Sequence, residues 1–142
     1  MKLSARNILT GTVASVKKGA VNAEVILDLK GGPSISAVIT NGSVDNLALK
    51  EGVEAFAIIK ASSIIVGTDL HDAKVSARNI ICGTVSKVVE GPVSAEVGID
   101  IGNGNILTAV ITEESAQNLG YQAGGHACAM FKAASVILGV KG

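Results

Sequence analysis

One stretch of the sequence, AEVILDL at residues 23–29, returns 72 residues later as AEVGIDI at residues 95–101. In both copies apolar side chains occupy every second position and acidic side chains fall between them, with Ile26 and Gly98 as the exceptions. A period of two with many β-branched residues is typical of a strand that buries one face. The stretch therefore predicts a β structure, and its return predicts that this structure is built twice.

The repeat extends over almost the whole chain without a gap. SARNI at residues 4–8 returns at 76–80, and AVIT at residues 37–40 returns at 109–112. Of the 70 residue pairs aligned at this offset, 32 are identical. Shared composition does not produce such agreement, so we interpret the chain as a tandem duplication. We expect a first domain at residues 1–68, a linker at 69–74 and a second domain at 75–142.

Each copy has the element order of a small barrel. In the first copy, further strands are expected near residues 7–16, 35–40, 54–60 and 64–66, and GGP at 31–33 is typical of a turn. A short helix is expected at residues 43–49, with its counterpart at 115–120 and with Ser43 and Ser115 as N-caps. The predicted fold class is therefore all-β, with two tandem OB-like five-stranded β-barrels and one short helix in each.

Composition excludes several classes of protein. Twelve basic and twelve acidic residues cancel, and aromatic residues make up only 2%, which disfavours a nucleic-acid-binding surface. No apolar run approaches the ~20 residues that span a bilayer, and the first residues show no export signal. We therefore expect a cytoplasmic protein with reduced, buried thiols at Cys82 and Cys128. Because the cysteines lack metal-ligand spacing and neither His71 nor His126 is repeated, no ligands for a metal cation are expected.

The polar residues that both copies retain indicate a site for an anion. An ionised oxyanion offers only acceptors, so its site should contain cations, hydroxyls and backbone N–H groups. Carboxylates would repel the ion, so Glu24 and Asp28 are interpreted either as solvated residues or as ion-pair partners. The retained polar set in the first copy is Ser4, Arg6, Asn7, Thr12, Glu24, Asp28, Thr40, Ser43, Asn46, Lys60 and Ser63.

Spacing suggests how the donors could meet. Alternation places Ser4 and Arg6 on one face of a strand. Thr40 and Ser43 lie at the expected helix start, where exposed N–H groups and the helix dipole favour an anion. Lys60 ends a strand, so a backbone N–H beside it could join the ammonium group.

Four short motifs of the sequence, taken in order, resemble those of a known family. SARN at 4–7, GAVNAEV at 19–25, ITNGS at 39–43 and KAS at 60–62 together resemble the Mop domain, the molybdate-binding domain of the molbindins. A chain of two such domains is similar to the di-Mop cytoplasmic molbindins. The resemblance implies OB-like barrels, a homotrimer, and oxyanion sites between domains or subunits. It also implies intracellular storage and homeostasis of molybdate, with tungstate as a second ligand and with no cofactor.

The resemblance also implies which residues bind the anion. Ser4, Arg6, Lys60 and Ala61 of one domain would act with Thr40 and Ser43 of a neighbouring domain. The second copy offers the same set without substitution, as Ser76, Arg78, Lys132, Ala133, Thr112 and Ser115. Further sites near the threefold axis would use the backbone of Gly19, Ala20, Val21, Asn22, Gly91, Val93 and Ser94, whereas Pro92 has no N–H to donate.

Three other classes of function fit the sequence less well. An enzyme is not expected, because the sequence lacks a repeated histidine, a nucleophile–base pair and a P-loop. The main alternative is a non-catalytic β oligomerisation or interaction module without an anion ligand, in which the charged residues form interface ion pairs. A nucleic-acid-binding OB-like protein is a weaker alternative because of the neutral charge and few aromatics.

Overall fold

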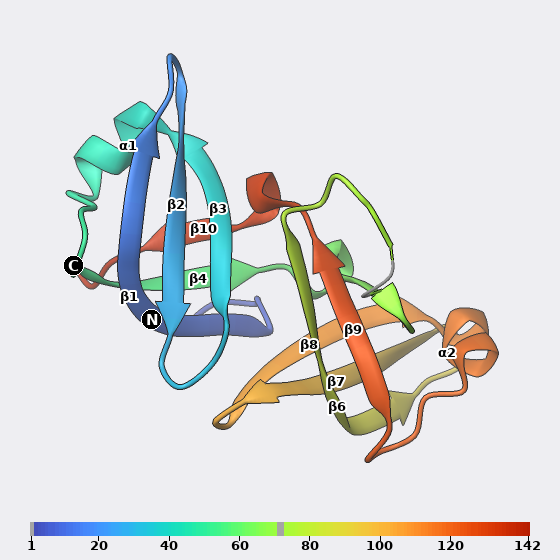
Figure 1. Ribbon diagram of the computed structural model, residues 1–142. Coiled ribbons are helices and arrows are strands. Elements are labelled where there is room, and N and C mark those ends of the chain that lie inside the picture. The colour runs from blue at the N-terminus through green and yellow to red at the C-terminus, as the bar shows by residue number, and fades with distance from the viewer. Residues whose placement is uncertain (1, 71–72) are drawn as a thin grey trace.

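The computed structural model describes residues 2–70 and 73–142, which form two curled five-stranded antiparallel sheets (Figure 1). This confirms the predicted all-β class with two five-stranded units and a short helix in each. The first repeat contains β1 (Asn7–Lys18), β2 (Asn22–Leu29), β3 (Ser34–Thr40), α1 (Asn41–Asn46), β4 (Glu54–Ile59), the 3-10 helix η1 (Ala61–Ser63) and β5 (Ile65–Gly67). The second contains β6 (Asn79–Glu90), β7 (Ser94–Gly102), β8 (Asn105–Thr112), α2 (Glu113–Leu119), β9 (His126–Phe131), η3 (Ala133–Ser135) and β10 (Ile137–Gly139).

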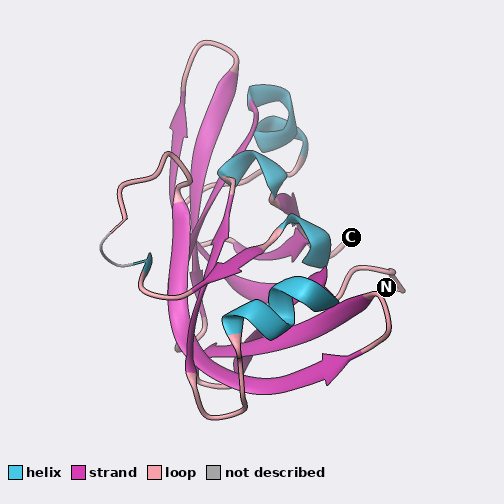
Figure 2. Cartoon of the chain, turned by 90° about the vertical axis from the view of Figure 1, so that its right-hand side faces the viewer, coloured by secondary structure: helices cyan, strands magenta, loops and turns pink. Residues whose placement is uncertain are grey.

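The alternation seen in the sequence is the alternation of burial in the strands. In β2, Val25, Leu27 and Leu29 are buried, whereas Asp28 is exposed. An antiparallel sheet with one solvated face gives this pattern. Figure 2 shows that strands dominate the chain and that the short helices connect strand ends. In the part of the chain that the structure describes, no helix has the length and apolarity needed to span a membrane.

Each sheet curls because its first strand pairs with two partners. In the first sheet, Asn7–Thr12 of β1 pairs with β4, and residues 11–18 of β1 pair with β2, with a register shift between Val13 and Ser15. Gly11 lies where the two pairings overlap, and a Cβ there would lie 2.3 Å from the carbonyl oxygen of Asp28. Only glycine permits this close approach of two backbones.

The two repeats exchange their last strands. β10 of the second repeat pairs with β4 of the first, and β5 of the first repeat pairs with β9 of the second. The strand orders are β10-β4-β1-β2-β3 and β5-β9-β6-β7-β8, so the C-terminal strand lies on the first sheet (Figure 1). The domain limits expected at residues 68 and 75 follow the sequence repeats, whereas the sheets cross them. The expected linker at 69–74 falls partly on residues 71 and 72, outside the described residues, as does His71.

The helix starts differ from the prediction. Thr40 and Thr112, not Ser43 and Ser115, are the N-caps, so the predicted caps were wrong. Each threonine keeps the extended backbone of the preceding strand, and its Oγ1 accepts the N–H of the serine three residues later, at 3.0 and 3.1 Å. Ser43 and Ser115 therefore lie within the first turn.

The cysteines also differ from the prediction. The pairing of β6 with β9 places Cys82 directly opposite Cys128, and the two form a disulfide. Cys128 is buried and Cys82 is partly buried. The prediction of reduced thiols was therefore wrong for this structure, because strand register brings together two residues that are 46 positions apart in the sequence.

Candidate functional site

The predicted donors of the first repeat lie together. Ser4, Arg6, Lys60 and Ala61 line one cavity of about 520 Å³. The second repeat closes this cavity with residues from β8, η3 and β10, and η1 packs against β8. The cavity is thus formed between the two repeats of a single chain. The residues contributed by the second repeat are Val110, Ser135 and Ile137.

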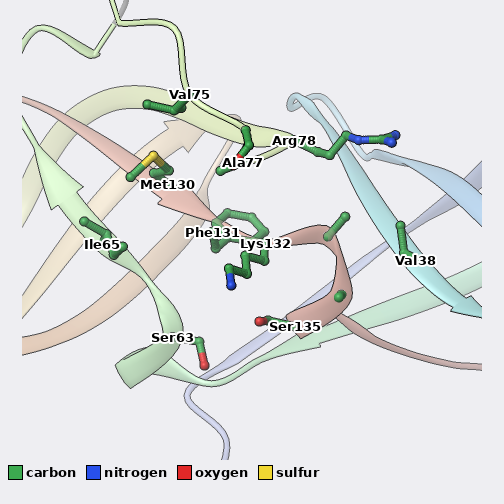
Figure 3. A pocket seen from close by; sticks show the side chains of 13 residues that line it. Val38, Ser63, Ile65, Val75, Ala77, Arg78, Met130, Phe131, Lys132 and Ser135 are labelled. Atoms are coloured by element: carbon green, nitrogen blue, oxygen red, sulfur yellow. The ribbon is translucent and has the colours of Figure 1, made fainter.

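The second repeat builds the same arrangement. Ser76, Arg78, Lys132 and Ala133 line a cavity of about 560 Å³ that is completed by residues of the first repeat (Figure 3). In Figure 3 the side chain of Arg78 points away from that of Lys132 and extends towards Val38. The duplication in sequence therefore corresponds to two similar sites in space.

The backbone beside each lysine is set by a single helical turn. β4 ends at Ile59, Lys60 is extended, and its carbonyl accepts the N–H of Ser63 at 2.9 Å. The first N–H groups of such a turn have no partner inside it. Ala61 is 7% exposed, so its small side chain is packed inward while the turn borders the cavity. The lysine, the serines and the first amides of the turn are all donors.

Each arginine is held by a carboxylate of the other repeat. Arg6 forms an ion pair with Glu96, and Arg78 forms one with Glu24. Of the two interpretations left open for Glu24, the structure shows the ion-pair partner. A guanidinium has five N–H donors, so one carboxylate does not use all of them. Asp28 lies apart from these pairs and accepts a hydrogen bond from the Ser34 hydroxyl.

The threonine–serine pairs lie apart from the cations within one chain. Thr112 Oγ1 donates to Ser115 Oγ at 2.8 Å, and both residues line a cavity of about 470 Å³ with Val93 and Ser94. This cavity borders the Arg6 cavity at Val110, which lines both. In the first repeat Thr40 and Ser43 make the matching hydrogen bond at 2.9 Å. The structure therefore brings together the first four residues of each predicted set but not its threonine and serine.

In the hairpins expected to bind further anions, some backbone N–H groups already donate hydrogen bonds within the hairpin. The Gly19 N–H donates to the Asn22 carbonyl at 2.7 Å, and the Gly91 N–H donates to the Ser94 carbonyl at 2.9 Å. Gly19 and Asn22 line a smaller cavity of about 310 Å³ together with Lys17, Lys18 and Arg78. These bonds occupy the amides of Gly19 and Gly91, so the backbone amides left as candidate donors are those of Ala20, Val21, Asn22, Val93 and Ser94.

Two serines that sequence reasoning left out of the site belong to it. Ser63 and Ser135 each line both the Arg6 cavity and the Arg78 cavity. Figure 3 shows both side chains on the same side of the cavity as Lys132. Their retention in both copies was the signal that could have found them.

A second cluster was also missed. Ligand atoms of Cys82, His126 and Cys128 all lie within 4.8 Å of one another. Because none of the three is repeated, comparison of the copies does not reveal them. The spacing of His126 and Cys128, two residues apart on one strand, was the available signal.

Comparison with known proteins agrees with the duplicated architecture. The family model of the TOBE domain matches residues 3–66 and again residues 75–138. The chain belongs to the TOBE domain family. Its two TOBE domains cover almost all of the sequence, and the resemblance to molbindins expected from the motifs is confirmed by the relatives described next.

Several relatives of the tandem TOBE domains are named for molybdenum. The chain is 46% identical over 138 residues to the molybdenum-pterin-binding protein MopA of Rhodobacter capsulatus, covering 97% of this chain and 52% of MopA. It is 43% identical over 142 residues to the molybdenum transport protein ModE of Azotobacter vinelandii, covering 100% of this chain and 52% of ModE. The chain thus spans about half the length of these curated relatives.

A solved structure matches the whole chain. The crystal structure of the cytoplasmic molybdate-binding protein ModG with molybdate bound has a TM-score of 0.95 and 44% sequence identity, covering 99% of this chain and 100% of that one. Agreement over the full length means that the tandem TOBE domains share with ModG both the fold and the placement of the two repeats.

Proposed function

We propose that this chain binds molybdate and buffers its concentration in the cytoplasm, with tungstate as an alternative ligand. The observation that carries the proposal is the donor set Ser4, Arg6, Lys60 and Ala61 in one cavity between the repeats, built a second time around Arg78. Similarity over the full length to ModG, whose crystal structure contains molybdate, supports the choice of ligand and the cytoplasmic location.

The chemistry of the donors suits a tetrahedral dianion. The Lys60 ammonium and Arg6 guanidinium supply two positive charges and charge-assisted hydrogen bonds, which are stronger than neutral ones. Ser4, Ser63 and the first amides of η1 supply directional donors that replace part of the ion's hydration shell. Binding of this kind forms no covalent bond and transfers no electron, so the ion leaves unchanged. The proposal therefore assigns neither a catalytic step nor a cofactor.

A complete site would use more than one chain. Ser4, Arg6 and Lys60 are exposed at the cavity, whereas Thr40 and Ser43 lie at another place on the same chain. We propose that a homotrimer brings the Thr40–Ser43 or Thr112–Ser115 pair of one chain to the cations of another. Ligand binding and assembly are then linked, so molybdate should raise the melting temperature of the protein.

Additional anions would bind at the hairpins near the threefold axis. The amides of Ala20, Val21 and Asn22 in one hairpin and of Val93 and Ser94 in the other are the proposed donors. These hairpins are tied to the helix starts, because the Val21 carbonyl accepts the Asn41 N–H at 2.9 Å and the Val93 carbonyl accepts the Glu113 N–H at 3.0 Å. Val21 and Val93 are 70% and 79% exposed, which leaves both hairpin tips accessible to other subunits.

Equilibrium dialysis against molybdate, with sulfate as competitor and elemental analysis as readout, tests the proposal. We expect two or more molybdenum atoms per chain, retained in excess sulfate. A value above two would support the additional sites on the hairpins. Absence of bound molybdenum, or its complete loss to an equal concentration of sulfate, would instead favour an interaction module whose charged residues make ion pairs only.

A further inference from the structure

The disulfide of the second repeat has a histidine beside it. Cys82 on β6 lies opposite Cys128 on β9, and His126 precedes Cys128 by two residues on the same strand. His126 Nε2 lies 3.7 Å from Cys128 Sγ. Among residues 2–70 and 73–142, these three side chains form a group whose ligand atoms all lie within 4.8 Å of one another.

The cluster belongs to the second repeat alone. The positions aligned with Cys82, His126 and Cys128 carry Thr10, Glu54 and Phe56 in the first repeat. Strand register places these three residues at the equivalent place on the first sheet, with Thr10 opposite Phe56. The second sheet therefore has two cysteines and a histidine at a location where the first sheet has none. The predicted donors for the oxyanion are identical in both repeats.

One separation within the cluster already suits a tetrahedral metal ion, and the two bonded sulfur atoms move apart when the disulfide is reduced. Zn²⁺ binds thiolate sulfur at about 2.3 Å and imidazole nitrogen at about 2.0–2.1 Å, so neighbouring ligand atoms around it lie about 3.5–3.8 Å apart. The 3.7 Å between the Cys128 sulfur and the His126 nitrogen already has this value. His126 is exposed and Cys82 is partly buried, so an ion can enter from solvent and keep water as its fourth ligand.

We propose that the reduced chain binds one Zn²⁺ through Cys82 Sγ, Cys128 Sγ and a ring nitrogen of His126. Two thiolates and one imidazole form a ligand set that is typical of zinc sites in proteins. This site is separate from the oxyanion cavities, because none of its three residues lines the Arg6 or the Arg78 cavity.

The zinc site and the disulfide exclude each other because they use the same two sulfur atoms. A dithiol reductant breaks the bond between Cys82 and Cys128 by thiol–disulfide exchange. It gives up two electrons and two protons, becomes a disulfide itself, and leaves two cysteine thiols. Zinc then displaces one proton from each thiol to solvent as the thiolates bind. Oxidation of the thiols by a disulfide of a small molecule reverses these steps and releases the ion.

The test compares the reduced and oxidised forms of the full chain. The protein is reduced with a dithiol, freed of it by gel filtration without oxygen, and titrated with Zn²⁺ against a chromophoric chelator. We expect one Zn²⁺ per reduced chain and at least a hundredfold weaker binding by the oxidised chain. Co²⁺ in place of Zn²⁺ should give thiolate-to-metal charge-transfer absorption in the reduced chain alone. Equal zinc binding by both forms, or none by the reduced form, would overturn the proposal.

The first repeat supplies the variants. Cys82→Thr and Cys128→Phe introduce the residues that the first sheet carries at these positions, and each should lower zinc affinity at least a hundredfold. His126→Ala should lower it at least tenfold while leaving disulfide formation intact. Glu54→Ala, at the aligned and likewise exposed position of the first repeat, is the matched control and should bind zinc as the unmodified chain does. Unchanged zinc binding by Cys82→Thr together with His126→Ala would place the ion elsewhere, and molybdate dialysis on the same samples tests the anion sites independently.

Discussion

The side chain of Asn7 hydrogen-bonds both main-chain groups of Thr108 in the other repeat. Its Nδ2 donates to the Thr108 carbonyl at 2.8 Å, and its Oδ1 accepts the Thr108 N–H at 2.7 Å. Asn79 makes the same pair of bonds with Ser36, at 2.9 and 2.8 Å. Thr108 and Ser36 lie on β8 and β3, the outer strands of the two sheets. Each buried side-chain amide thus bonds the main-chain N–H and C=O groups that a neighbouring strand would otherwise bond. In this way it joins one sheet to the edge of the other.

Removal of this amide should destabilise the fold. Asn7→Ala deletes the two bonds to Thr108 and a third to the Ile59 carbonyl, at a residue that is 1% exposed. Buried polar groups left without partners cost about 1–3 kcal/mol each, so we expect the free energy of unfolding to fall by about 2–4 kcal/mol. Equilibrium unfolding in urea measures it. Asn46→Ala is the control, since Asn46 is also retained but exposed, and an equal loss in both variants would contradict the role given to Asn7.

Loss of one arginine should remove one class of anion site. Arg6 and Arg78 line different cavities, each with its own lysine. We therefore expect Arg6→Ala to abolish molybdate binding at the Arg6 site and to leave the Arg78 site largely intact. Dialysis should then give fewer molybdate ions per chain, and the affinity of the remaining sites should be unchanged. Arg78→Ala should give the mirror result. Loss of all bound molybdenum in either variant would show that the two sets do not act independently.

The carboxylate beside each arginine should weaken anion binding. Glu96 is paired with Arg6, so a bound oxyanion must share the guanidinium with a like charge. Two unit charges about 4 Å apart in water interact by about 1 kcal/mol. Glu96→Gln should therefore tighten molybdate binding at the Arg6 site by about threefold to tenfold, measured by isothermal titration calorimetry. Asp28→Asn, which alters a carboxylate bonded to Ser34 away from the cavity, serves as control. Weaker binding by Glu96→Gln would mean that the ion pair positions the arginine.

The strands and the donor sets could be predicted from the sequence because both are recorded in local patterns. Alternation along residues 23–29 follows directly from burial of one sheet face. Retention of Arg6 and Lys60 in both copies marked two residues that strand geometry then brings to one cavity. No pairing between distant strands had to be known for either inference.

Other features could not be predicted because they depend on strand pairing or on a choice between equivalent residues. Thr40 and Ser43 are both good capping residues, and only the end of β3 decides that Thr40 is the cap. Cys82 and Cys128 meet through the register of β6 and β9. The strand exchange is hidden for a different reason: β5 and β10 have the same apolar pattern, so either could pair with either sheet.

A pair of equivalent glycines tests the strand exchange. Gly139 on β10 lies opposite Phe56, where a Cβ would come within 2.5 Å of the ring, whereas a Cβ on Gly67 of β5 would have the Leu70 side chain as its nearest neighbour, at 3.3 Å. Gly139→Ala forces the ring aside and should cost about 1–3 kcal/mol, while Gly67→Ala should change stability by less than about 0.5 kcal/mol. Urea unfolding of both variants measures the difference, and Phe56→Leu should partly rescue Gly139→Ala. If each strand instead paired within its own repeat, Gly67 would face Phe56 and Gly139 would face Cys128, and the two alanine variants would exchange their effects.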